Sequence, residues 1–393
     1  MFPSGHFPPS LLQFMSSDSP RDGAHPGRRA TYVSLFALLL TAAACGSPEG
    51  PVVFGLAGPF RTEYGASMQQ GAELARRDIN QAGGIDNRLL EFRVVDDAAD
   101  PDSAMRVAET LFRDPEVVAV VGHVNSGTTV QAAATYERGL PAVATSATSP
   151  VVSTQGKWIF RVASSDSSNS MALARFARRL GLTSAVLYEN EDYGRGLANG
   201  FRNAMIDAGG QVVEMDPYLP GTPDLSPYLE RMKARGVKLV FLAGLQDDAA
   251  RIIRQAHEVG LAAHFLGGDG VEGLAQKGPE FNGTMVGLLF HPEASPAAAR
   301  FAERYRAAYH HEPDSFAALG YDATRLLAAA AEEAGPRRSS IRSYLAGLGR
   351  PDGAPPFEGV TGTIRFDANG DPVAKDFNIG SMWAGKITLE GEG

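Results

Sequence analysis

Five polar side chains lie just beyond the ends of expected strands, in two separate parts of the sequence. Tyr64, Ser126 and Thr148 lie in the first part, and Tyr193 and Asp269 lie in the second. Hydroxyl groups can hold a carboxylate, while an acid with aromatic hydroxyls nearby can hold an ammonium group. Burying either charge without such a partner costs several kcal/mol. The set therefore suits a small zwitterion held between two lobes.

Each of these positions also has a simpler structural interpretation. Ser126 fits a helix N-cap, because serine is a preferred capping residue. Asp269 stands between glycines and fits a turn, and Tyr193 fits a packing residue at the start of a helix. Taken together, the five positions favour a binding site.

The stretch 117–150 organises the first part of the chain. It is expected to form a buried strand over 117–121, a loop of small residues, an amphipathic helix and a second strand that ends in a Ser/Thr-rich loop. Ligands of open α/β sheets usually lie where such loops follow the carboxyl ends of strands. The N–H groups and hydroxyls over 126–129 would open the helix and could hold a carboxylate.

Strands and helices alternate along the rest of the chain. The pattern runs through four strands, breaks at the polar segment 164–170, and then starts again. Alternation with short loops predicts parallel sheets that are covered on both faces. The expected fold class is therefore α/β, with two doubly wound parallel-sheet lobes. The tail over 362–383 is expected to form a hairpin around an Asn-Gly turn.

Composition narrows the class of protein. The chain has 393 residues, of which 44% are hydrophobic and 21% charged, and this length suffices for two domains. The formal net charge of −9, without a basic cluster along the sequence, argues against nucleic acid as a partner. It also predicts no charge-driven affinity for an anionic membrane surface.

The first 44 residues are expected to lie outside the fold. Residues 1–27 are rich in Pro, Ser and Gly and predict disorder or a start codon placed too early, with Met15 as another start. Two arginines then precede an apolar run over 32–44 that is too short to span a bilayer, which predicts a signal peptide that is removed. Cys45 follows three alanines, as in the lipobox of bacterial lipoproteins. We expect lipidation of Cys45 and a tether over 45–51.

Signatures of catalysis are weak. Cys45 is the only cysteine, so the chain has no internal disulfide and no cysteine metal site. The eight histidines lack ligand spacing, and no Gly-x-Ser-x-Gly turn follows a strand. Gly194, Gly196 and Gly200 miss the dinucleotide fingerprint by one position, and 367–371 lacks the terminal glutamate of a calcium loop. We expect no enzyme activity, no cofactor and no metal.

Motifs along the whole mature chain resemble one known family. They are GPF…GAELARRDINQAGGI, VVDDAADP, VVAVVGHVNSGTT, TSATSP, EDYGRGLA, RQAHEVGL and FLGGDGV. The chain resembles the branched-chain amino acid (leucine/isoleucine/valine-type) substrate-binding proteins of ABC transporters, within the type I periplasmic binding proteins. The resemblance implies two lobes joined by three crossings, with lobe I over 52–164 and 293–358 and lobe II over 165–292 and 359–390.

The resemblance also implies roles for individual residues. The ligand carboxylate is expected at Ser126 and Thr148, with main-chain N–H groups nearby. The ammonium is expected at Asp269, where relatives commonly have glutamate, and at the main-chain carbonyl of Ser146. In such proteins two tyrosines line the cleft, and the positions that match them in this chain are Tyr64 and Tyr193.

One segment departs from the family pattern and leaves the ligand open. After the strand over 237–243 the family usually has aromatic residues, whereas this chain has Leu245 and Gln246. Leu245 favours an aliphatic side chain, and Gln246 favours something more polar. We expect a monomeric, lipid-anchored, extracytoplasmic protein that closes over an aliphatic amino acid and delivers it to an ABC permease. There are two alternatives. The same fold could bind an amide, urea or an aromatic acid, or the chain could be a ligand-sensing receptor module.

Overall fold

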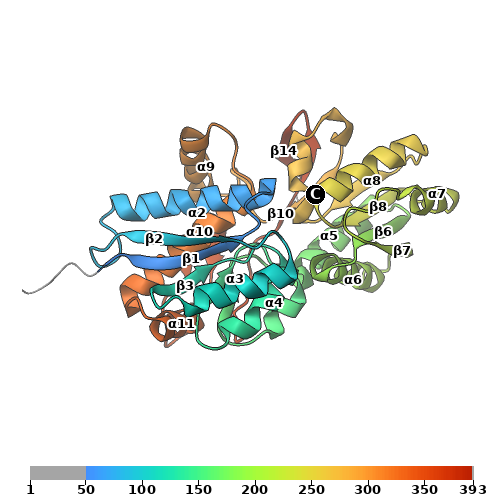
Figure 1. The fold of residues 1–393 in the computed structure, drawn as a ribbon. Coiled ribbons are helices and arrows are strands. Elements are labelled where there is room, and N and C mark those ends of the chain that lie inside the picture. Colours follow the sequence, from blue (N-terminus) through green and yellow to red (C-terminus); the bar gives the residue numbers. More distant parts are fainter. Residues whose placement is uncertain (1–49, 392–393) are drawn as a thin grey trace, which may run out of the picture. The chain divides into compact units, whose positions relative to one another are not determined.

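Residues 50–391 are described by the computed structural model, and they form two large sheets covered by helices, with a separate two-stranded sheet near the end of the chain (Figure 1). The expected signal peptide over 1–44 and Cys45 lie outside the described residues. Within the described part, no helix combines the length and the apolar composition that crossing a membrane requires.

The first sheet contains five parallel strands in the order β2-β1-β3-β4-β5. All seven residues of β1 are buried, because helices cover both faces of the sheet. This confirms the predicted parallel α/β architecture. Its strands are β1 (Val52–Gly58), β2 (Leu90–Asp96), β3 (Val117–Val121), β4 (Ala142–Ala144) and β5 (Ile159–Arg161), joined by α2 (Glu63–Gln81), α3 (Pro101–Arg113), α4 (Ser126–Tyr136) and the short η1 (Pro150–Thr154).

The second sheet has seven strands in the order β14-β13-β10-β9-β8-β6-β7, of which the last five are parallel. Its strands are β6 (Ser184–Glu189), β7 (Val212–Tyr218), β8 (Leu239–Ala243), β9 (His264–Gly267), β10 (Met285–Leu288), β13 (Asn378–Trp383) and β14 (Lys386–Leu389). The connecting helices are α5 (Asp166–Leu180), α6 (Asp192–Asp207), α7 (Ser226–Ala234), α8 (Gln246–Glu258), η2 (Asp269–Gln276) and η3 (Pro279–Phe281).

The predicted hairpin at the tail is wrong. β12 (Gly362–Ile364) pairs with β11 (Phe357–Gly359), and β13 instead pairs antiparallel with β10 and β14. The Asn-Gly turn does form, but it contacts β5, where the N–H of Arg161 donates to the carbonyl of Gly370. The turn therefore closes against the first sheet, while β13 extends the edge of the second sheet, making that sheet mixed.

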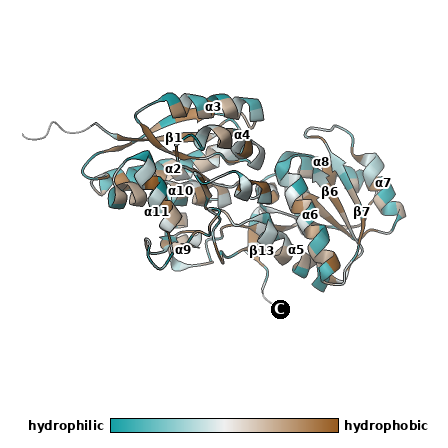
Figure 2. Ribbon diagram, turned by 90° about the horizontal axis from the view of Figure 1, so that it is seen from below, coloured by the Kyte–Doolittle hydropathy of each residue, from teal (hydrophilic) through white to brown (hydrophobic). Residues whose placement is uncertain are grey.

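The chain passes between the two sheets three times. It crosses after β5, returns after β10, and crosses again between β12 and β13. The helices that follow β10 belong to the first sheet, where they join its hydrophobic clusters: α9 (Pro296–Tyr309), α10 (Ser315–Ala334) and α11 (Arg338–Gly347). Figure 2 shows that the strands of both large sheets are mostly hydrophobic, whereas the helices that cover them carry both hydrophobic and hydrophilic residues. The exact residue boundaries of the two lobes stay a prediction.

A close helix crossing positions one side of the ligand-binding region. A Cβ on Gly71 of α2 would lie 1.9 Å from the carbonyl oxygen of Ala317, and one on Gly320 of α10 would lie 2.4 Å from that of Met68. The absence of side chains at these glycines lets the two backbones touch. This crossing joins the N-terminal halves of α2 and α10, and the first turn of each helix carries an aromatic residue, Tyr64 in α2 and Phe316 in α10.

Candidate functional site

A hollow lies where the carboxyl ends of strands from the two sheets face each other. Loops after β3 and β4 contribute to one wall, and loops after β6, β8 and β9 contribute to the other. This is the position at which open α/β sheets usually bind ligands. Its lining residues are Val124, Asn125, Ser126, Ser146, Tyr193, Leu245, Asp269, Gly270 and Phe316. Five of the predicted site residues are therefore brought together: Ser126, Ser146, Tyr193, Leu245 and Asp269.

The start of α4 forms part of the first wall. Asn125, not Ser126, is the N-cap residue, and its side chain makes no capping hydrogen bond. Ser126 is buried, and its hydroxyl accepts a hydrogen bond from the N–H of Ser149 at 3.1 Å. The first N–H groups of a helix carry partial positive charge, so this end of α4 favours a carboxylate.

Asn125 connects the helix start to the predicted tyrosine. Its amide donates to the hydroxyl of Tyr64 at 3.2 Å, and the Tyr64 ring lies 5.3 Å from the ring of Phe316. Tyr64 is largely buried and lies behind Asn125 and Phe316, which line the hollow themselves. Burial raises the pKa of Tyr64, so its hydroxyl stays protonated at neutral pH.

The loop after β4 contains buried hydroxyls without partners. The hydroxyl oxygens of Thr145, Ser146 and Thr148 make no hydrogen bond of normal geometry with a described residue, although that of Thr148 lies near the carboxylate of Asp166. A buried hydroxyl in this condition costs about 1–3 kcal/mol, and a ligand carboxylate would supply the missing acceptor. Thr148 is fully buried beside the hollow and does not line it, so its predicted contact needs a small adjustment of the loop.

A buried arginine fixes the backbone of this loop. Arg161, at the end of β5, donates to the carbonyl oxygens of Ala147 at 3.1 Å and Ser149 at 2.9 Å. Its charge is balanced by Asp371, whose carboxylate lies 2.7 Å away. Thr148 lies between the two anchored carbonyls, so Arg161 holds in place the main chain that carries a predicted ligand contact.

The second wall presents a carboxylate in a fixed orientation. The hydroxyl of Tyr193 donates to Asp269 at 3.0 Å and accepts from the N–H of Gly270 at 3.1 Å. Asp269 is only 4% exposed, and burial raises its pKa to about 6, although the hydrogen bond from Tyr193 opposes the shift. At neutral pH this carboxylate is mostly ionised, and an ammonium group would stabilise the charge further.

A second acid beside the hollow gave no signal in the sequence. Asp166 begins α5 and is fully buried; the side chains of Thr148 and Asn169 lie near its carboxylate, but neither carboxylate oxygen makes a hydrogen bond of normal geometry with a described residue. Burial, and next the charge of Asp269, raise its pKa to about 8. Two buried acids that repel each other create a site with strong preference for a cation. The sequence placed Asp166 in a polar break and gave no signal for this role.

Leu245 and Gln246 are adjacent in sequence but point to different places. Leu245 lines the hollow, whereas the side-chain amide of Gln246 donates to the carboxylate of Glu63 in α2, at 2.7 Å. Lys277 lies 3.2 Å from the same carboxylate. Gln246 is thus part of a direct contact between the two lobes and lies outside the hollow. Its contact with the ligand stays a prediction.

The apolar part of the hollow consists of three residues from different elements. Val124 follows β3, Leu245 follows β8, and Phe316 is in the first turn of α10. Of these three, only Leu245 was predicted from the sequence. Phe316 lies in a helix that does not follow any of the strands at the hollow, so no local pattern indicates it. Within the described residues, no group of three or more His, Cys, Asp or Glu could hold a metal ion.

Known proteins that are similar to this chain include several that are described as binding proteins. A family model described as periplasmic binding protein matches residues 51–386. The chain is similar to Leu/Ile/Val-binding protein homolog 1 of Brucella suis, with 32% identity over 354 residues, covering 88% of this chain and 94% of that protein. The leucine-, isoleucine-, valine-, threonine-, and alanine-binding protein of Pseudomonas aeruginosa is 31% identical, covering 82% and 88%.

A solved structure agrees with these relatives. The branched-chain amino acid transporter substrate-binding protein LivJ of Streptococcus pneumoniae, in complex with isoleucine, has a TM-score of 0.76 and 29% identity. The match covers 86% of this chain and 99% of that chain. All three relatives are named as binding proteins, in agreement with the expectation that the chain is not an enzyme.

Proposed function

Because the chain belongs to the periplasmic binding protein family, we propose that it captures an aliphatic amino acid, most readily a branched-chain one, in the hollow between its lobes. It then delivers this ligand to an ABC permease. Family membership implies an extracytoplasmic location. Lipidation of Cys45 would retain the protein at the membrane.

The observation that carries this proposal is the division of charge between the two walls. The start of α4 and the hydroxyls of Ser126, Ser146 and Thr148 suit a carboxylate. The opposite wall holds Asp269, oriented by Tyr193, and suits an ammonium. A zwitterion that bridges the walls would satisfy both sides and favour the closed arrangement of the lobes.

The apolar lining supports an aliphatic side chain on the ligand. Val124, Leu245 and Phe316 offer carbon surface without a buried charge of their own. Relatives named for leucine, isoleucine and valine support the same class. An aromatic acid is the second candidate, because the rings of Tyr64 and Phe316 already contact each other beside the hollow.

Calorimetric titration of a ligand panel tests the proposal. Leucine, isoleucine, valine, alanine, threonine, urea and benzoate are titrated into the purified protein, with thermal shift as a second readout, since a ligand that binds only the native state raises the melting temperature. We expect the branched-chain amino acids to bind best. Binding of benzoate in preference to every amino acid would reject the proposal in favour of the aromatic-acid alternative.

Membrane attachment is tested separately. A Cys45→Ser variant of the full chain should appear in the soluble extracytoplasmic fraction, while the native protein remains with the membrane. Equal distribution of both proteins would exclude lipidation of Cys45 and leave the ligand-binding proposal unaffected.

A further inference from the structure

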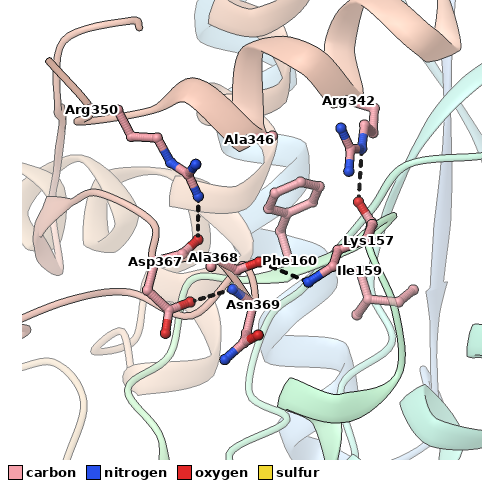
Figure 3. A pocket seen from close by; sticks show the side chains of 10 residues that line it. Lys157, Ile159, Phe160, Arg342, Ala346, Arg350, Asp367, Ala368 and Asn369 are labelled. Atoms are coloured by element: carbon pink, nitrogen blue, oxygen red, sulfur yellow. Dashed lines mark hydrogen bonds between the residues drawn. The ribbon is translucent and has the colours of Figure 1, made fainter. Parts of the chain in front are cut away.

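A hollow with a cationic rim lies on the first lobe, at the opposite end of the sheet from the ligand-binding hollow. Figure 3 shows its rim, with Lys157 before β5, Arg342 on α11 and Arg350 just after α11. The rest of its lining is apolar at Ile159, Phe160 and Ala346, and is completed by the turn over 367–370, which includes Asp367. These residues come from three separate parts of the chain, so the cluster exists only in the folded protein.

The three cations keep their charge uncompensated. Lys157 donates to the carbonyl of Ala368 at 3.1 Å, Arg342 to that of Lys157 at 2.9 Å, and Arg350 to that of Asp367 at 3.2 Å. These acceptors are neutral, and among the described residues none of the three cations forms an ion pair. Each cation therefore has N–H groups left for an anion.

The acids at this hollow are engaged by backbone N–H groups and form no ion pair with the three cations. Asp367 lines the hollow, and its carboxylate accepts from the N–H groups of Asn369 and Asp371, within its own turn. The carboxylate of Glu137 accepts from the N–H of Trp158 at 2.5 Å. Arg342 also lies over the ring of Trp158, 6.0 Å from its centre. The rim therefore presents positive charge on a chain whose net charge is negative.

This hollow lies at the same edge as the point where the chain enters the fold. Gly50 leads into the start of β1, and the starts of parallel strands lie at the same edge of the sheet. β5 is the third strand from β1, so it lies about 14 Å away at the usual spacing between neighbouring strands. Arg338 of α11 donates to the carbonyl of Val117, which is paired with Val53 of β1. Only five residues separate Gly50 from the proposed lipidation site at Cys45, and a stretch of that length spans at most about 18 Å.

We propose that the rim of Lys157, Arg342 and Arg350 docks on the phosphate groups of anionic phospholipids, at the membrane to which Cys45 would tether the chain. This inference rests on the proposed lipid anchoring. The tether raises the local lipid concentration, so that a weak electrostatic contact is enough to orient the protein. Docking through this edge directs the ligand-binding ends of the strands away from the bilayer, where they are open to ligand.

Tryptophan quenching tests the contact directly. The chain has two tryptophans, Trp158 beside the rim and Trp383 on the second sheet. The protein beginning at Gly50, a compact unit with its own hydrophobic cores, is mixed with vesicles of equal parts phosphatidylglycerol and brominated phosphatidylcholine at low salt. We expect quenching of Trp158 in a Trp383→Phe variant and little quenching of Trp383 in a Trp158→Phe variant.

Paired variants identify the residues responsible. Because each basic residue near an anionic surface contributes about fivefold in affinity, Arg342→Gln/Arg350→Gln should weaken vesicle binding by at least tenfold. Arg175→Gln/Arg178→Gln on α5 is the matched control, since Arg178 also donates to a carbonyl, that of Ala208. The control should change binding by less than twofold, and vesicles of phosphatidylcholine alone or 0.5 M salt should abolish it.

Three outcomes would overturn the proposal. They are equal binding by the native protein and the rim variant, equal weakening by the α5 control, and binding of inorganic phosphate without binding of vesicles. Leucine titration of each variant reports on the proposed function independently, because the rim lies outside the ligand-binding hollow. The use of a chain without Cys45 also separates this contact from the anchoring proposal.

Discussion

The two walls of the ligand-binding hollow hold their polar groups in different ways. On the second wall the hydroxyl of Tyr193 has both a donor and an acceptor, so Asp269 is fixed before any ligand arrives. On the first wall the hydroxyls of Ser146 and Thr148 have no partner. The difference indicates that one wall is preorganised for an ammonium, while the other gains its hydrogen bonds only from the ligand.

The acid on the preorganised wall should give the largest effect. Asp269→Ala is expected to weaken amino acid binding by about 100-fold or more, because the ammonium loses a buried charged partner. Circular dichroism and melting temperature should remain near those of the native protein, and calorimetry measures the affinity. A loss of less than tenfold would mean that Asp166, or no acid at all, holds the ammonium.

The hydroxyls of the other wall should show a smaller, two-sided effect. Thr148→Val keeps the shape of the side chain and removes a buried hydroxyl without a partner. We expect the ligand-free protein to become more stable by about 1 kcal/mol, while amino acid affinity falls about tenfold.

Ser126→Ala provides the contrast with Thr148→Val. It should weaken binding by about tenfold as well, but it should destabilise the ligand-free protein, because the N–H of Ser149 loses its acceptor. Chemical denaturation and calorimetry of both variants measure these changes. If both variants lower stability equally, the two hydroxyls do not differ in the way the structure indicates.

The pH dependence of stability distinguishes the buried acids. Asp166 has a pKa raised to about 8, so its contribution to stability is present at acidic pH and is lost as pH rises toward 8. Asp166→Asn removes this loss. The melting temperature of the ligand-free variant should exceed that of the native protein by about 3 °C or more at pH 8, with little difference at pH 4. A constant difference across this range would show that Asp166 does not titrate as described.

The contact between lobes outside the hollow should give the smallest effect. Gln246→Ala removes a hydrogen bond to Glu63, whose side chain is largely exposed, and leaves the hollow unchanged. We expect amino acid affinity to change by less than threefold, since exposed polar pairs contribute little. A tenfold or larger loss in calorimetry would return Gln246 to the ligand site, as the sequence analysis proposed.

Much of the fold could be predicted because its periodicity is local. Alternating buried strands and amphipathic helices required parallel sheets with helices on both faces, and polar residues after strand ends had to gather at one edge of a sheet. The tail was predicted wrongly because β13 pairs with β10, a strand far away in the sequence, in preference to its neighbour β12. Pairing of that kind depends on which sheet edge is available, and no local pattern reports it.

The sequence by itself determined the strands, the helices and the residue types that can hold a zwitterion. Tertiary structure decided which of them meet. It placed Gln246 against Glu63 and outside the ligand-binding hollow. It brought Asp166 and Phe316 to that hollow. It also gathered three distant cations, Lys157, Arg342 and Arg350, into one basic rim. The negative net charge and the absence of a basic run predicted no charge-driven membrane affinity. These three cations are far apart in the sequence. Electrostatic interaction depends on distance in space, so only the folded arrangement makes them act together.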